Sequence, residues 1–417
     1  MMILAAVALL ALAQDIPVKP GDDLPAAIAR ASKGAVVTLA GGRYPMSQFM
    51  FGPSASGVTV RSKPGERAEI DFENHGGFYL KADGVVLKDL DILNAQNHAV
   101  DIDGSDCRLD GCRIFGSGAD VVKLSPGNWQ QKKYNKGATI IRCEIGKNKA
   151  FEGIDCVGHD DVKVIDCYIH DTPGWGVYLK GGAVRGLIEG CVFERCGTLE
   201  NNPAGGACLG EHTGPDEVMT NKHDKPWENV DGVVRNCMFV DIPGPAMAAW
   251  CAKNATFANN TCVNGAVKDR ASFIVLSNHG LPCLDVTFVN NIVVGSPAGN
   301  RPLVWIYDKG GDGKLVFENN LYFGGNGRFW NTAAGGPVGF EEWKSKLGFD
   351  KTSLFVDPKL DGELHLTAGS PAVDKGKALT GFLTDFDGAK RSAPWDIGAD
   401  EFQAGPARPL RPAAKPK

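Results

Sequence analysis

Four segments between residues 98 and 180 alternate apolar residues with polar ones, and the polar residues are of types that carry acid–base chemistry. Their apolar pairs are Val100 and Ile102, Val122 and Leu124, Ile154 and Cys156, and Val177 and Leu179. Such alternation places the intervening residues on the opposite face of a strand. Stacked in register, the outward residues form three columns: Asp101, Lys123, Asp155 and Tyr178; Asp103, Ser125, Val157 and Lys180; and His98, Asp120, Glu152 and Trp175.

These residue types suit the cleavage of an acidic polysaccharide by β-elimination. That reaction needs a base for the proton next to a carboxylate, and a cation that neutralises the developing enolate. Lys180 is the first choice for the base, and Lys123 is an alternative base or a clamp on the carboxylate. The candidate donors of a proton to the leaving oxygen are Tyr178, His98 and His212. The candidate substrate-binding residues are Trp175, which could stack on a sugar ring, Glu152, Glu211 and Trp129.

The same face offers hard oxygen ligands of the kind that Ca²⁺ prefers. The candidate ligands are Asp101, Asp103, Asp120 and Asp155. Calcium is therefore the one cofactor that the sequence suggests, and a polysaccharide is the expected partner.

Two other functions remain open at this point. The same four aspartates could supply the acid and the base of a glycoside hydrolase. Alternatively, the protein is a non-catalytic glycan-binding or cell-surface structural protein, whose columns of alternating charge are ion pairs on its surface. We favour an enzyme because acids, bases and aromatic residues are concentrated on four adjacent segments. The corresponding later stretches, 246–250 and 272–276, are almost wholly apolar.

An internal repeat predicts the elements that position these residues. A six-residue pattern, apolar-x-x-(Cys or Asn)-x-apolar, recurs with its fourth position at residues 90, 112, 143, 167, 191, 237, 260, 291 and 320, and Leu fills the first. The repeats lie 22 to 46 residues apart, which indicates one coil per repeat with loops of variable length. Short strands with this period predict an all-β fold, a parallel β-solenoid. Two long loops, 125–137 and 198–230, would then border the polar face.

Stacked coils explain the repeated position. Asn260, Asn291 and Asn320 would form a ladder of side-chain hydrogen bonds, since stacked strands lie about 4.8 Å apart. Five cysteines fill the same position in the first half of the chain, so we interpret the 12 Cys residues mainly as small buried free thiols rather than disulfides or metal ligands.

The two ends of the chain differ from the repeats. Residues 1–13 are apolar and end in Ala-Leu-Ala, which predicts a signal peptide and a secreted or periplasmic protein. Asp22 and Asp23 precede a short amphipathic helix that we expect to cap the first coil, within an N-terminal region spanning 14–80. Residues 350–402 form a closing segment of the domain 14–402. A tail rich in proline and basic residues, 403–417, is predicted to be disordered.

Three stretches resemble the pectate-lyase-like superfamily of single-stranded right-handed parallel β-helices, as found in exported bacterial proteins. They are the helix followed by VVTLAGGRY at 36–44, the coils around GWGVYLKGG at 174–182, and the closing segment with FVDP at 355–358, GSPAVD at 369–374, DFDG at 385–388 and DIGADE at 396–401. The resemblance implies a right-handed β-helix and, for several lyases of the superfamily, a Lys or Arg base with an acidic Ca²⁺ site. It is much less specific for function than for fold.

Composition is consistent with one long core. The 417 residues include 53 Gly, are 43% hydrophobic and 22% charged, and carry a formal charge of −5. This balance gives no support for a nucleic-acid partner. No apolar run reaches the roughly 18 residues that span a bilayer. We expect a monomer that does not cross a membrane.

Overall fold

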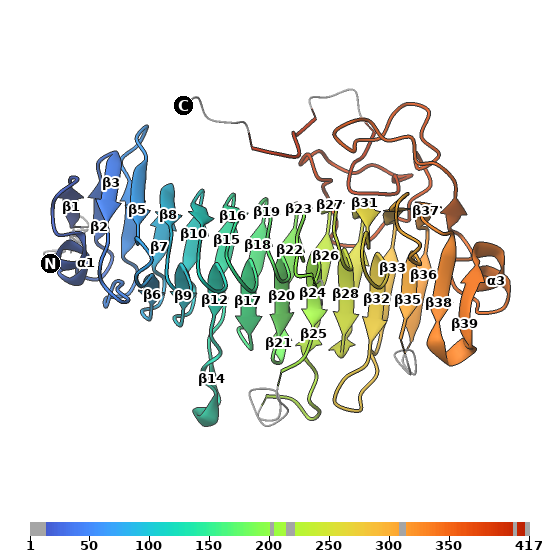
Figure 1. Ribbon diagram of the computed structural model, residues 1–417, viewed down its shortest axis with the longest axis horizontal. Helices are drawn as coiled ribbons and strands as arrows, with labels where there is room; N and C mark the ends of the chain where they lie inside the picture. The colour runs from blue at the N-terminus through green and yellow to red at the C-terminus, as the bar shows by residue number, and fades with distance from the viewer. Residues whose placement is uncertain (1–13, 201–203, 214–221, 308–313, 403–406, 413–417) are drawn as a thin grey trace, which may run out of the picture.

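The computed structural model describes residues 14–200, 204–213, 222–307, 314–402 and 407–412. Within them the chain forms a long solenoid with three parallel sheets along its axis (Figure 1). The prediction of a parallel β-solenoid is confirmed. The predicted signal peptide, 1–13, lies outside the described residues, so export stays a prediction.

From β4 to β38, each coil contributes one strand to each long sheet. Sheet A contains β1 (Asp15–Val18), β2 (Val36–Leu39), β4 (Thr59–Ser62), β7 (Val86–Lys88), β10 (Arg108–Asp110), β15 (Thr139–Ile141), β18 (Lys163–Ile165), β22 (Leu187–Glu189), β26 (Val233–Arg235), β30 (Thr256–Ala258), β33 (Val286–Val289) and β36 (Leu315–Glu318). Sheet B contains β3 (Gly42–Pro45), β5 (Ala68–Asp71), β8 (Leu90–Leu93), β11 (Arg113–Phe115), β16 (Glu144–Gly146), β19 (Tyr168–His170), β23 (Val192–Glu194), β27 (Met238–Val240), β31 (Thr261–Gly265), β34 (Ile292–Gly295), β37 (Leu321–Gly324) and β40 (Leu354–Phe355).

Sheet C carries the polar face. It contains β6 (Phe78–Leu80), β9 (Val100–Ile102), β12 (Val122–Leu124), β17 (Ile154–Val157), β20 (Val177–Lys180), β24 (Ala207–Gly210), β28 (Met247–Trp250), β32 (Phe273–Leu276), β35 (Val304–Ile306), β38 (Arg328–Asn331) and the antiparallel β39 (Gly336–Gly339). Smaller elements are the hairpin of β13 (Gly127–Asn128) and β14 (Lys133–Tyr134) around η1 (Trp129–Gln131), the short strands β21 (Ala183–Val184), β25 (Asn229–Val230) and β29 (Ala252–Lys253), and η2 (Thr332–Ala334).

The repeated Cys or Asn position lies at the bend between sheets A and B. At all nine repeats the residue just before it has a positive φ, between 50° and 64°. Only the left-handed region makes so sharp a bend, and it favours Gly, Asn and Asp. Eight of the nine residues are of these types, the exception being Arg142.

The stacked side chains at this bend behave as the repeat predicts. Asn260 Nδ2 donates to Asn291 Oδ1 over 2.9 Å, and Asn291 Nδ2 donates to Asn320 Oδ1 over 3.2 Å. Asn260 Oδ1 in turn accepts from the backbone N–H of Cys237. All 12 cysteines are free and buried, as the interpretation of them as structural thiols requires.

The ends of the solenoid carry the two described α-helices, α1 (Leu24–Ala29) and α3 (Phe340–Ser345) (Figure 1). The side chain of Asp23 accepts a hydrogen bond from the backbone N–H of Ala26, which caps the N-terminus of α1. Leu24 and Ile28 are buried in the main core. A protective role of α1 for the first coil stays a prediction.

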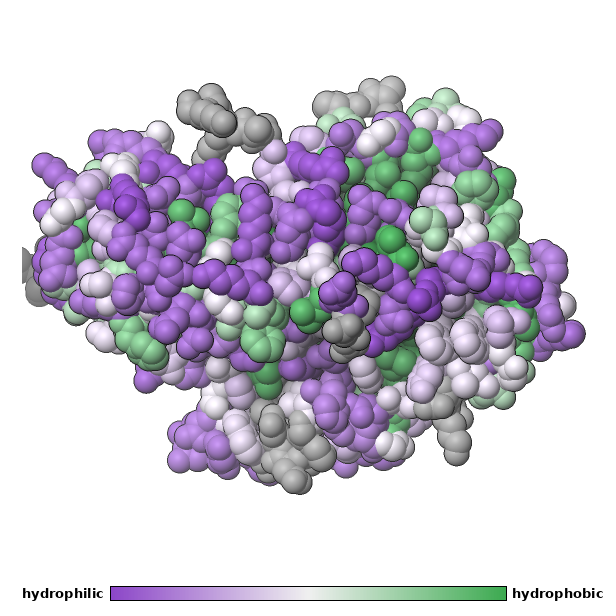
Figure 2. Space-filling view, viewed as in Figure 1, coloured by the Kyte–Doolittle hydropathy of each residue, from purple (hydrophilic) through white to green (hydrophobic). Residues whose placement is uncertain are grey.

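The C-terminal segment folds back over the later coils of sheet B (Figure 1). Phe386, Ala399 and Leu410 are buried against Val192 and Met238. Figure 2 shows hydrophobic side chains where this segment crosses the solenoid, within a largely hydrophilic surface.

The expectation of disorder from residue 403 onward is wrong for residues 407–412. Arg408 pairs with Asp166 and Arg411 with Glu194, each within 2.8 Å. Leu410 is buried between these pairs and the sheet. The basic residues that predicted a solvated tail are therefore the contacts that hold this part of it in place.

Candidate active site

The register of sheet C places the predicted outward residues side by side. Asp101 pairs with Lys123, Lys123 with Asp155, and Asp155 with Tyr178 on consecutive strands. Lys180 lies beside Val157 in the neighbouring column. The alternation in the sequence therefore correctly predicts which side chains share this face.

Lys123 is held between two carboxylates. Its ammonium forms an ion pair with Asp155 and lies 3.9 Å from Asp120 Oδ2. Burial lowers the pKa of Lys123, but the charge of Asp155, its hydrogen bond and the charge of Asp120 outweigh this effect, so the pKa lies above its ordinary value. Lys123 therefore keeps its proton, which makes it a poor candidate for the predicted alternative base.

Glu152 lies on the column next to this ion pair. Its backbone N–H donates to Asp120 Oδ1 over 3.1 Å. Burial raises the pKa of the Glu152 carboxyl to about 9, helped by a hydrogen bond with Asp120 and by the charges of Asp120, Asp155 and Glu211. The side chain still reaches the surface. Glu152 is therefore a carboxylic acid that retains its proton at neutral pH, which is the state that a proton donor needs.

The space that Glu152 occupies depends on a glycine in the next coil. A Cβ at Gly174 would come within 2.6 Å of Glu152 Oε1. The chain therefore reaches Trp175 through a residue without a side chain, and this leaves room for the acid.

A second group of residues surrounds Lys180. Its Nζ lies 4.2 Å above the centre of the Tyr178 ring and 3.8 Å from Glu211 Oε2. Trp175 Nε1 donates to the other oxygen of Glu211 over 2.8 Å. Burial raises the pKa of Glu211, while the charge of Lys180 and the hydrogen bond from Trp175 oppose the rise. The Trp175 ring is only 1% exposed, so it offers no face for the expected stacking on a sugar and instead positions Glu211.

The backbone of Glu211 is strained. Its φ is 143°, whereas the other described non-glycine residues with positive φ lie between 49° and 65°. Residues held in so unfavourable a conformation cluster at functional sites, where the surrounding structure maintains them. Here the carboxylate contacts with Trp175 and Lys180 are the visible constraint.

Sequence reasoning missed the residues that hold this loop. Glu228 is fully buried and accepts hydrogen bonds from the backbone N–H of Gly181 over 3.0 Å and of Thr213 over 2.5 Å. His279 Nε2 lies 2.8 Å from its Oε1. The His279 ring stacks on His212, with the ring centres 5.5 Å apart. Because 51 residues separate Glu228 from His279, no local spacing could have revealed the pair.

Three other predicted residues, His98, Trp129 and His212, do not contact Lys180 in the described structure. His98 Nδ1 is 3.4 Å from Asp120 Oδ2, at the edge of the acidic group. Trp129 lies in η1 of the β13–β14 hairpin, and within the described residues it makes no side-chain hydrogen bond and no ring contact with the face. His212 contacts Asn278 and His279 rather than Tyr178.

The predicted calcium ligands do not fit a calcium ion. Within the described ranges, no three of Asp101, Asp103, Asp120 and Asp155 bring carboxylate oxygens within 4.8 Å of one another. The ammonium of Lys123 lies beside both Asp120 and Asp155, and Asp103 is hydrogen-bonded to Tyr79. Ca²⁺ requires six to eight oxygens around one point, so we derive no chemistry through it.

The same face becomes apolar in the next coils, as the sequence predicts. Tyr178 is followed in register by Cys208, Ala248 and Ile274, all fully buried, and then by Trp305. These side chains form one apolar cluster with Trp175 and Tyr178. In this column the charged residues therefore end before the coil that carries Lys180, and in the next coil Glu211, directly after β24, is the acid that contacts Lys180.

Three stacked parallel sheets, with buried acids and lysines gathered on one of them, define a β-helix protein with a candidate active site on its outer surface. The chain belongs to the right-handed β-helix family, since the model described as "right handed beta helix region" matches residues 67–337. No curated protein matches the sequence. In the described part of the chain, no helix is long and apolar enough to cross a membrane.

Solved structures with similar folds have little sequence in common with this chain. PfbA, a surface adhesin of Streptococcus pneumoniae, is 13% identical with a TM-score of 0.52, over 73% of this chain and 86% of its own. A mannuronic acid specific polysaccharide family 6 lyase from human gut microbiota is 14% identical, with a TM-score of 0.42, over 84% and 92%. An alginate lyase from Paenibacillus is 17% identical, with a TM-score of 0.44, over 75% and 94%. At such identities the likeness to the adhesin concerns the fold alone.

Proposed function

We propose that this protein is a carbohydrate-active enzyme that hydrolyses a polysaccharide on the outer face of sheet C. The observation that carries the proposal is Glu152, a largely buried carboxyl on a face with further acids, whose pKa is raised to about 9 by burial, by its hydrogen bond with Asp120 and by nearby carboxylates. A glycosidic bond breaks when an acid protonates its oxygen while a carboxylate supports attack on the sugar carbon. Two carboxyl groups whose surroundings push their pKa values apart can divide these roles.

Glu211 is the carboxylate that we assign to the second role. Burial raises the pKa of Glu211, but Trp175 and Lys180 lie 2.8 Å and 3.8 Å from its two oxygens, and both favour its charged form. A carboxylate held in this way accepts a proton from water or attacks the sugar directly. Lys180 and Trp175 then act as positioning residues, and Glu228 with His279 holds the loop that carries Glu211.

The charge of the face favours a neutral polysaccharide over an acidic one. Six carboxyl groups lie here, and the two lysines are both next to carboxylates. The six carboxyl groups are those of Asp101, Asp103, Asp120, Glu152, Asp155 and Glu211. An anionic chain would be repelled by these groups, whereas a neutral sugar contributes hydroxyl donors.

Two carboxylate oxygens on the face are ready to accept such donors. Asp101 Oδ1 and Asp155 Oδ1 are buried and have no hydrogen-bond partner among the described residues. A buried acceptor without a partner costs free energy, which a hydroxyl group of a bound sugar would recover.

β-Elimination is the second candidate reaction, and one contact favours it. Lys180 lies against the Tyr178 ring, so a base and a phenolic proton donor are adjacent on the face. Burial and the charges of Asp155, Glu152 and Glu211 raise the pKa of Tyr178, so its hydroxyl keeps its proton. This arrangement would serve a lyase, but only on a substrate whose carboxylate tolerates the surrounding acids.

Product analysis tests these functions. The protein is incubated with neutral and acidic polysaccharides, with and without EDTA. New reducing ends without ultraviolet-absorbing products, unaffected by EDTA, are expected on a neutral polymer. Unsaturated products that absorb in the ultraviolet would identify a lyase and contradict our assignment of Glu152. Binding without cleavage of any polymer would contradict both enzymatic functions.

A further inference from the structure

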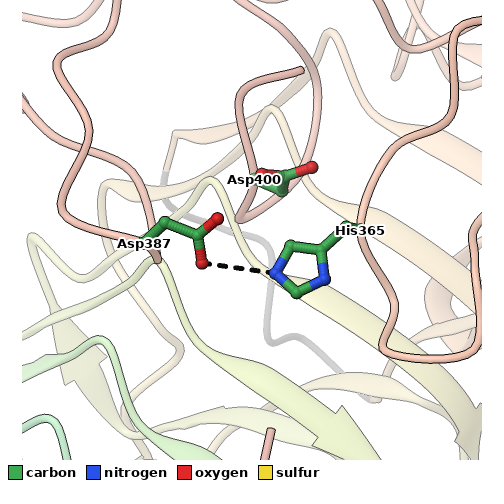
Figure 3. Close-up of side chains that lie close together, drawn as sticks. All are labelled: His365, Asp387 and Asp400. Atoms are coloured by element: carbon green, nitrogen blue, oxygen red, sulfur yellow. Dashed lines mark hydrogen bonds and ion pairs between the residues drawn. The ribbon is translucent and has the colours of Figure 1, made fainter. Parts of the chain in front are cut away.

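A second group of chemically reactive side chains lies in the C-terminal segment, far from sheet C. His365, Asp387 and Asp400 come from three separate stretches and converge at one point (Figure 3). His365 Nε2 is 3.2 Å from Asp387 Oδ1, and one ligand atom from each of the three residues lies within 4.8 Å of the others. Within the described residues this is the only group of three His, Cys, Asp or Glu side chains so arranged.

The group is buried, and its histidine is incompletely bonded. His365 and Asp400 are each 5% exposed. His365 Nδ1 is a buried atom without a hydrogen bond in the described structure, 3.8 Å from Asp361 Oδ1. An imidazole buried to this degree normally has both nitrogens satisfied. The two nitrogens face different groups: Nε2 lies beside Asp387, where it could bind an ion, and Nδ1 is directed toward Asp361, the kind of carboxylate to which a metal-bound imidazole donates its other N–H.

The surroundings of the histidine are strongly acidic. A cavity of about 460 Å³ is lined by the three residues together with Asp361 and Asp385. Of two nearby arginines, Arg391 pairs with Glu401, which also lines the cavity, at 2.9 Å, and Arg408 pairs with Asp166 at 2.7 Å, so in the described structure neither forms an ion pair with Asp387 or Asp400. Burying several carboxylates together is costly unless a cation compensates them. The cavity also provides a path by which an ion could enter.

Backbone contacts orient the two carboxylates. Asp400 Oδ2 accepts from the N–H of Leu366 over 2.7 Å, and Asp387 Oδ1 accepts from the N–H of Arg408 over 2.9 Å. Such outer contacts fix the direction of metal ligands in proteins. They also show that the convergence of these side chains is built into the folded segment.

We propose that His365, Asp387 and Asp400 bind one divalent transition-metal ion, Zn²⁺ or Mn²⁺. An imidazole nitrogen with carboxylate oxygens is a ligand set that such ions accept, whereas Ca²⁺ takes oxygen ligands. Two ligands each about 2.1 Å from an ion lie roughly 3 to 3.5 Å apart, and the His365–Asp387 distance is in this range. Water from the cavity completes the coordination.

The ion would tie together the stretches that hold this segment against sheet B. Phe386 and Ala399 are the neighbours in sequence of Asp387 and Asp400, and both are buried against the solenoid. The backbone N–H of Ala399 also donates to Thr261 Oγ1 over 3.0 Å. The bound ion is therefore structural, and its loss should loosen the segment rather than abolish the β-helix.

Metal binding to the full chain tests this site. Protein stripped with a chelator is titrated with Zn²⁺ and with Mn²⁺ by calorimetry, and its melting temperature is measured with and without the ion. We expect one ion per chain and a higher melting temperature when it is bound. Loss of a hydrogen-bond partner of a metal ligand typically weakens metal affinity by roughly 10- to 100-fold. Asp387→Asn and Asp400→Asn remove a ligand itself, so each should weaken binding by more than this. Asp357→Asn, an exposed residue of the same segment, is the matched control.

X-ray absorption by the Zn²⁺-loaded wild-type protein identifies the ligands even if a variant fails to fold. Nitrogen and oxygen neighbours are expected, with no sulfur. Sulfur neighbours would place the ion at the cysteines and overturn the proposal. So would binding of neither ion at one per chain, unchanged affinity in Asp400→Asn, or an equal loss in Asp357→Asn.

Discussion

One column of outward side chains on sheet C has two contrasting halves. Over β9 to β20 it reads Asp101, Lys123, Asp155 and Tyr178, and over β24 to β32 it continues as Cys208, Ala248 and Ile274. The backbone pairing is parallel and in register throughout. The β-helix can therefore fill this column with apolar residues and does not need charge here. The buried charges of the first half are therefore not required by the fold, and this agrees with the catalytic role that we propose for them.

The charged half also differs in how its groups depend on one another. Lys123 compensates Asp155 and Asp120, whereas Glu152 has no cation beside it in the described structure and burial raises its pKa to about 9. In the apolar half each side chain contributes to stability only through its own burial.

Replacing Glu152 should have the largest effect. Glu152→Gln keeps the size of the side chain but removes the transferable proton, so turnover should fall by about 10²- to 10⁴-fold. Reducing-end assays on the polysaccharide identified by product analysis measure the loss. Glu69→Gln, a surface residue of sheet B, is the control and should keep wild-type turnover. Equal turnover in the two variants would remove Glu152 from the mechanism.

Removing the central lysine should destabilise the charged half. Lys123→Met leaves Asp155 buried without its cation, which should lower the free energy of unfolding by about 3–5 kcal/mol. Urea unfolding measures the change, with Lys163→Met on the exposed surface as the control. A loss of stability no greater than that of the control would mean that the ion pair contributes little to the free energy of unfolding.

Removing the donor to Glu211 should have a moderate effect. Trp175→Phe deletes the Nε1 hydrogen bond but keeps an aromatic ring. A hydrogen bond to a charged group contributes about 1.5–3 kcal/mol, so turnover should fall about 10- to 100-fold. The pKa of Glu211 should also rise, moving the acidic limb of the pH–rate profile upward. A change in stability with an unchanged profile would assign Trp175 a purely structural role.

The pH dependence follows from the raised pKa of Glu152. The folded protein holds this proton up to a pH of about 9, whereas the unfolded chain releases it near 4.5. The folded state therefore binds more protons between these values, and Glu152 should reduce stability as the pH rises. Turnover should decline about tenfold per pH unit above 9, since the donor is lost. Glu152→Gln should abolish this contribution to the pH dependence of stability.

A polar group in the apolar half should leave catalysis unchanged. Ala248→Ser places a hydroxyl at a fully buried position, which should cost about 1–3 kcal/mol of stability. Turnover of the folded variant should match that of the wild type. A large loss of turnover would extend the active site into the coils that we describe as structural.

The sequence predicts the stacking well because the signal is local. Alternation within each strand places Asp101, Lys123 and Asp155 on one face, and the residue before each Cys or Asn marks the bend. The protonation of Glu152 could not be predicted, because it depends on burial and on Asp120, 32 residues away. Lys123 was a candidate base for the same reason: the sequence does not show that two carboxylates enclose it.

Contacts between loops were the least predictable. Glu228 and His279 meet across 51 residues, and the loops that bring them together carry no repeat. His365, Asp387 and Asp400 lie in the closing segment, and nothing in their spacing along the sequence shows that they converge. The register of strands in a solenoid follows from the alternation of side chains along each strand. The position that a loop reaches depends on the whole fold.

The protonation state of Glu152 tests the account most directly and needs no substrate. Carbon-13 NMR of protein labelled at glutamate carboxyl groups follows each titration, and Glu152→Gln identifies the Glu152 signal. The account predicts a midpoint near 9 for this carboxyl. A midpoint near the ordinary value of 4.5 would show that Glu152 is ionised at neutral pH, and would contradict its role as the proton donor.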